Sequence, residues 1–143
     1  MTARAQDDLE TAWMRVARGE LGVTEHAGGP NDRIRQYLAT VQAPDGANWC
    51  AAFAAWCLEQ SGYSGPWTGA ARSFQHVGQA LDSFKPGCIV VLWRESPDSW
   101  MGHVAFGVRE GATTLTLLGG NQGGAVRQSV YSRKRLLGYR WPL

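Results

Sequence analysis

The chain has 143 residues, a formal net charge of +2 and 18% charged residues, values that are ordinary for one folded domain. The small net charge excludes the strongly basic profile of a nucleic-acid-binding protein, and no apolar run reaches the roughly 20 residues of a membrane span. We therefore expect residues 1–143 to form a single domain and a monomer, with no nucleic-acid partner and no membrane insertion.

The first half of the chain carries helix patterns. Residues 7–10 look like a variant of a capping box, and an amphipathic helix should follow and end near Gly22. A second short helix is expected to begin at Asn31 or Asp32, and another should cover residues 70–77.

The helix around Cys50 is the most informative stretch. Asn48 is a good N-cap and Gly62 a natural stop, so Cys50 should lie in the first turn of this helix. The helix dipole and the unpaired N–H groups there favour a thiolate and could also stabilise an oxyanion. We interpret Cys50 as a nucleophile, although a cysteine on an apolar helix face is also often a buried structural residue, as we expect for Cys57.

The second half of the chain reads as strands separated by turn residues. The expected strands cover residues 88–93, 103–108, 114–118, 126–131 and 137–141. Helices followed by a meander of strands predict an α+β fold, in which N-terminal helices pack on an antiparallel sheet of about five strands.

The second and third of these strands should form a hairpin. A three-residue loop would place His103 opposite Asn121, on a face that small Ala105 and Gly107 leave open for the Cys50 helix. A two-residue loop would turn Asn121 to the opposite face. The arrangement therefore requires an odd-length loop or a compensating bulge.

Together these residues could hydrolyse an amide. The Cys50 sulfur would attack the carbonyl, His103 would supply a proton to the leaving amine, and Asn121 would hold the imidazole in one tautomer. The N–H of Cys50 would donate to the oxyanion, with Asn48 a candidate for the second donor. Taken singly, a histidine near a loop is more often structural, and an asparagine before glycines is more often a turn residue.

Three motifs carry a family resemblance. The segments Trp49-Cys50-Ala51-Ala52-Phe53, Gly102-His103-Val104 and Gly119-Gly120-Asn121-Gln122 resemble the papain-like cell-wall hydrolases of the NlpC and CHAP type. The similarity extends from residues 20–23 to residues 138–142, which is nearly the whole chain. It implies the papain-like fold, with Cys50, His103 and Asn121 as the catalytic residues.

The chain departs from the common CHAP pattern at two points. Many CHAP domains have an acidic residue where this chain has Gly119, so no fourth catalytic residue is assigned, and no aspartate-rich calcium loop is present.

The implied substrate is bacterial peptidoglycan, cleaved at the muramoyl–L-alanine amide or within the stem peptide, with no cofactor and no metal. We name Trp49, Asn48 and Trp100 as candidates for substrate contacts, because a tryptophan offers a flat, amphipathic surface.

Delivery is a separate expectation. Residues 1–8 are polar and lack the apolar run of a signal peptide. We expect synthesis in the bacterial cytoplasm and action on the wall after release through a holin, a secretion system or a phage particle, as for a lysin or a wall-degrading effector.

The sequence also allows two alternative interpretations of the function of Cys50. The first is a non-catalytic module that binds wall glycan, in which Cys50 is only structural. The second is a metal site built from Cys50, Cys57, His26 and His103, although their spacing matches no common zinc motif.

Overall fold

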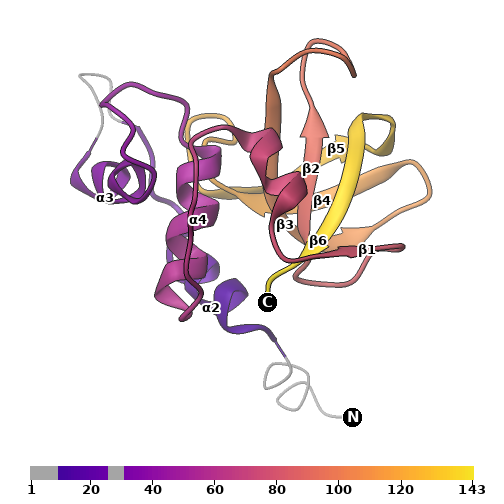
Figure 1. The fold of residues 1–143 in the computed structure, drawn as a ribbon, viewed down its shortest axis with the longest axis horizontal. Helices are drawn as coiled ribbons and strands as arrows, with labels where there is room; N and C mark the ends of the chain where they lie inside the picture. The colour runs from indigo at the N-terminus through magenta and orange to yellow at the C-terminus, as the bar shows by residue number, and fades with distance from the viewer. Residues whose placement is uncertain (1–9, 26–30) are drawn as a thin grey trace.

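The computed structural model describes residues 10–25 and 31–143 and has three helices ahead of its strands (Figure 1). The helical elements are α2 (Ala12–Gly19), α3 (Asp32–Thr40), α4 (Cys50–Gln60) and the 3-10 helices η1 (Ala71–His76) and η2 (Arg133–Arg135). The strands are β1 (Gln79–Leu81), β2 (Ile89–Trp93), β3 (Gly102–Glu110), β4 (Thr114–Gly119), β5 (Arg127–Ser132) and β6 (Leu136–Trp141).

The strands form one antiparallel sheet in the order β1-β6-β2-β3-β4-β5. The predicted α+β class, with N-terminal helices packed on an antiparallel sheet, is confirmed. The short strand β1 was not predicted, because its three residues carry too little pattern to stand out from a loop.

Side-chain caps begin the first two helices. The Asn31 side chain accepts a hydrogen bond of 2.8 Å from the backbone N–H of Ile34, as expected for the start of α3. In α2 the cap is Thr11, which accepts from Met14. The expected capping box begins at Asp7, which lies outside the described residues.

Helix α4 is buried on almost every side. Figure 1 shows it between α3 and the sheet, and among its residues only Glu59 and Gln60 at its end are exposed. Tyr37 of α3 packs edge-on against Phe53, with 5.0 Å between ring centroids. The amphipathic helix that we expected is therefore a central helix, covered by other helices on one side and by strands on the other.

Strand β2 and most of β3, in the middle of the sheet, are buried on both faces. Val104 and Phe106 belong to the large core shared with α4, whereas Ala105, between them, belongs to a smaller core on the opposite face. The prediction that α4 packs on the Ala105 and Gly107 face is therefore wrong. The space at Gly107 is used by Phe84, whose ring would lie 2.4 Å from a Cβ added there. Alternation along β3 was read correctly, but it does not tell which of two buried faces receives the helix.

The β3–β4 hairpin uses the second of the two routes that we considered. The Gly111 N–H donates to the Thr114 carbonyl at 2.8 Å, so the turn has two residues and not three. A bulge between Gly107 and Arg109 then shifts the register, so that Phe106 pairs with Leu118. Because of this bulge, the first residues of β3 lie opposite the residues that directly follow β4.

Candidate active site

Cys50 is the first residue of α4 and is only 3% exposed. Its backbone N–H donates to Oδ1 of Asn48 at 3.3 Å, and the same oxygen accepts from Nδ2 of Asn121 at 3.0 Å. The N-cap of α4 is Trp49, which makes no side-chain cap hydrogen bond, so the prediction of Asn48 as the N-cap is wrong by one residue. As the structure stands, the N–H that we expected to meet an oxyanion is occupied by Asn48.

His103 lies near the start of β3, and its ring is hydrogen-bonded to Gln122. Nε2 of His103 lies 2.9 Å from Oε1 of Gln122, and both side chains are buried. The Tyr131 hydroxyl lies farther from the same nitrogen, at 3.4 Å. The imidazole is therefore held mainly by a single buried amide.

The other contacts of Gln122 determine the tautomer of His103. Nε2 of Gln122 donates to two backbone carbonyls, those of Leu117 at 3.2 Å and Arg127 at 2.7 Å. Carbonyls only accept, so the remaining Oε1 must accept from the imidazole, and the proton of His103 lies on Nε2. Nδ1 is thereby left with a free lone pair, which is the state that a general base requires.

Asn121 does not make the contact that was predicted for it. Its side chain bonds to Asn48, and its backbone has a φ of 54°, in the left-handed region. Asparagine after two glycines readily adopts this conformation, which ends the alternation of β4 and carries the Asn121 side chain away from the strand face. Gln122, the next residue, takes the place beneath His103.

Burial is the largest influence on both reactive groups. It raises the pKa of the Cys50 thiol, although backbone N–H groups of Val104 and Ala51 and the Arg94 cation act in the opposite direction. Burial also lowers the pKa of His103 from 6.5 to about 4, with Arg135 and Arg94 adding to the decrease and the Gln122 hydrogen bond opposing it. The resting pair is therefore a neutral thiol and a neutral imidazole. Desolvation of Cys50 thus opposes the thiolate that the helix dipole and the N–H groups favour.

A pocket of about 340 Å³ opens over His103. Its walls come from the turn before α4, the end of β2, the loop after β4, and the β5–η2 segment. The lining residues are Asn48, Arg94, His103, Asn121, Gln122, Gly123, Gly124, Tyr131 and Arg135. Asn48, His103 and Asn121, all predicted for the site, thus meet at one pocket.

The two predicted tryptophans lie elsewhere. Trp49 is 1% exposed, stacks on Tyr37 and donates to Glu25 at 2.7 Å, so it is a core residue without a surface for substrate. Trp100 is 83% exposed but is not among the residues that line the pocket. Its loop is held by Arg72, which donates to the carbonyls of Ser96, Pro97 and Met101.

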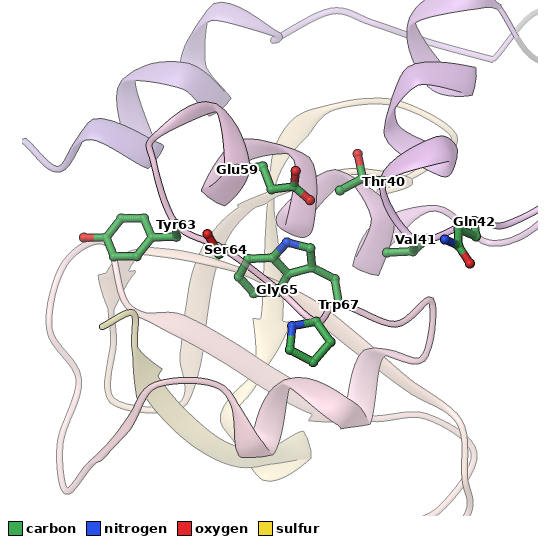
Figure 2. A pocket seen from close by; sticks show the side chains of 9 residues that line it. Thr40, Val41, Gln42, Glu59, Tyr63, Ser64, Gly65 and Trp67 are labelled. Atoms are coloured by element: carbon green, nitrogen blue, oxygen red, sulfur yellow. The ribbon is translucent and has the colours of Figure 1, made fainter.

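Figure 2 shows a second pocket, of about 460 Å³, at the other end of α4. Glu59 and Trp67 are among its walls, and none of the residues lining it is a cysteine or a histidine. Within residues 10–25 and 31–143, no group of three or more His, Cys, Asp or Glu side chains could hold a metal ion, and His26 of the alternative metal reading lies outside these ranges. None of the described helices is long and apolar enough to cross a membrane.

A cysteine that opens a buried helix, next to a strand histidine held by an amide side chain, defines a papain-like arrangement. The family model of the CHAP domain matches residues 42–121, and the chain belongs to this family. CHAP domains are generally cysteine- and histidine-dependent amidohydrolases or peptidases, and the family points to peptidoglycan as the substrate. No curated protein matches the chain.

Proposed function

We propose that this protein hydrolyses an amide bond of peptidoglycan, with Cys50 as nucleophile, His103 as general base and acid, and Gln122 as the residue that orients His103. The observation that carries the proposal is the buried hydrogen bond between His103 and Gln122, which leaves Nδ1 of His103 unprotonated and able to accept a proton. Backbone contact supports the proximity of the nucleophile, since the N–H of Val104, the residue after His103, stabilises the Cys50 sulfur.

The reaction begins from the neutral pair. Nδ1 of His103 accepts the thiol proton while the Cys50 sulfur forms a bond to the amide carbonyl carbon, which gives a tetrahedral oxyanion. The imidazolium then protonates the leaving amine as the C–N bond breaks, leaving a thioester on Cys50. Water, deprotonated by His103, hydrolyses the thioester and releases a carboxylic acid and the free thiol.

The oxyanion needs hydrogen-bond donors, but in the resting state the backbone N–H of Cys50 donates to Asn48 instead. The Cys50 N–H points to Asn48, whose exposed side chain can rotate away and exchange this hydrogen bond for one to substrate. Because Asn48 lines the pocket, its own amide N–H groups are then further candidate donors to the oxyanion. Asn48 is thus a substrate-contacting residue in this proposal, with Asn121 positioned to hold it.

Digestion of purified peptidoglycan tests the function. Wild-type protein should release fragments whose masses identify the cleaved amide, and Cys50→Ala or His103→Ala should lower the rate by on the order of 10³-fold or more. Cys57→Ala is the matched control, because Cys57 is fully buried in the same helix and has no role in the reaction. Full digestion by Cys50→Ala would overturn the proposal, and binding of walls without cleavage would favour the glycan-binding module.

A further inference from the structure

Two arginines from separate elements converge on the pocket above His103. Arg94 directly follows the last residue of β2, and Arg135 ends η2 just before β6. Both line the pocket of about 340 Å³ together with His103, and both are partly buried.

Neither guanidinium is neutralised by the protein in the part of the chain that the structure describes. No carboxylate of residues 10–25 or 31–143 lies within ion-pair distance of Arg94 or Arg135. Arg133, in the same short helix as Arg135, does have such a partner in Glu110, at 3.4 Å. Among the described residues that line the pocket, two are cations and none is acidic, which favours an anionic ligand.

Arg135 is held in place by its surroundings. Its Nε donates to the Trp93 carbonyl at 3.0 Å, and its guanidinium carbon lies 5.4 Å from the centroid of the Tyr131 ring. Within residues 10–25 and 31–143, its terminal nitrogens make no hydrogen bond, and a guanidinium has the fork geometry that suits a carboxylate. Both cations lower the pKa of His103, which independently places them within electrostatic reach of the reacting groups.

We propose that Arg94 and Arg135 form a carboxylate subsite, so that the preferred substrate carries a free carboxylate close to the scissile amide. A stem-peptide carboxylate is the anion that peptidoglycan offers. For cleavage this inference rests on the proposed function, but binding of a carboxylate to the pocket does not.

A matched pair of substrates tests the subsite. The probes are two soluble stem-peptide fragments of peptidoglycan that differ only in whether the carboxylate next to the scissile bond is free or amidated. Wild-type protein should cleave the free acid with a kcat/KM about 10- to 100-fold higher, the usual range for a charge-assisted contact. Arg94→Gln and Arg135→Gln should each remove most of this preference, because cleavage of the free acid should fall by a larger factor than cleavage of the amidated fragment. Arg135→Lys keeps the charge and should retain part of the preference. This variant serves as the test if Arg135→Gln disturbs the fold.

Lys134→Gln is the control, because Lys134 is an exposed cation of η2 that does not line the pocket. It should leave the preference unchanged. Equal cleavage of both fragments by wild-type protein, or an equal loss on both in the arginine variants, would overturn the subsite and leave the hydrolase intact.

Binding separates the subsite from the reaction. Calorimetry with Cys50→Ala protein should show tighter binding of the free acid than of the amidated fragment, and Arg94→Gln in that background should abolish the difference. If wild-type protein cleaves neither fragment but this difference is present, the proposed function fails and the subsite stands. Equal affinity for the two fragments would overturn the subsite.

Discussion

Gln122 fixes the orientation of His103 through a buried hydrogen bond. Its amide donates to two backbone carbonyls and accepts from the imidazole, so each of its polar atoms has a fixed role. A buried amide with all its partners satisfied resists rotation, since any other orientation would leave buried groups unpaired. The imidazole that it holds is therefore restricted to one tautomer.

Gln122→Glu should move the acidic limb of the pH–rate profile. A carboxylate next to the imidazole stabilises its protonated form, so the pKa of His103 should rise from about 4. Because only neutral His103 can accept the thiol proton, kcat/KM should then be lost at a higher pH than in wild type. The profile, together with NMR titration of His103, gives the measurement.

Asn121→Asp is the matched control for this change. It introduces the same charge one residue earlier, on a side chain that bonds to Asn48 and not to His103. The acidic limb should move much less. A large shift with Asn121→Asp and none with Gln122→Glu would restore the sequence-based assignment of Asn121 as the orienting residue. Thermal melting of both variants would report any loss of fold from the missing Gln122 donors.

At the scale of elements, the site depends on how closely α4 approaches the end of β4. Gly120, just after β4, makes this approach possible, since a Cβ there would lie 2.5 Å from Cβ of Phe53 and 2.9 Å from the Trp49 ring. Trp49 and Phe53 lie on either side of Cys50 in the sequence. The absence of a side chain at Gly120 therefore allows Cys50 to lie close to the loop that carries Gln122.

Gly120→Ala should therefore destabilise the protein and lower its activity. Relief of the contact requires α4 and the loop after β4 to separate, at a cost of about 1–3 kcal/mol, typical of overpacking. Denaturant unfolding and the rate of peptidoglycan cleavage would both be measured. Gly138→Ala is the control, because nothing lies within 4 Å of a Cβ added there. A Gly120→Ala protein as stable and active as wild type would show that α4 can shift without consequence.

Over the whole molecule, burial of a neutral histidine couples folding to pH. The pKa of His103 is about 4 in the folded protein against an ordinary 6.5, so between these values the unfolded chain binds a proton that the folded protein does not. Stability should therefore rise with pH across this window and be lost as pH falls through it, by about 3 kcal/mol at most.

The comparison of wild type with His103→Gln isolates this term. Other groups that titrate in the same range contribute to both proteins, so the difference between their unfolding free energies should shrink by up to that amount as pH falls from 7 to 4. Urea unfolding at a series of pH values gives the measurement. Parallel curves for the two proteins would show that His103 is not buried in its neutral form.

Much of this fold follows from local sequence. Apolar spacing predicted the helices, β-branched runs predicted most of the strands, and Asn31 marked the start of α3 through its own side chain. The positions of Cys50 at the start of a helix and of His103 on a strand were likewise readable, because each depends on patterns within a few residues.

The partner of the histidine was decided only by the tertiary structure. One extra residue in β3 sets the register, and one left-handed residue, Asn121, ends the alternation of β4. Their combination places Gln122, not Asn121, under His103. Neither the bulge nor the left-handed residue produces a periodic pattern in the sequence, so the direction of the side chains beyond them could not be predicted.

The same limit applies to charge and to packing. A helix N-terminus favours a thiolate locally, but the degree of desolvation depends on everything that covers Cys50, and here burial prevails. Likewise, alternation defined the two faces of β3, but only the packing of the whole chain determined which face receives α4. The sequence by itself determined the elements and the reactive residue types; their mutual distances, partners and protonation states arose from contacts between segments far apart in the chain.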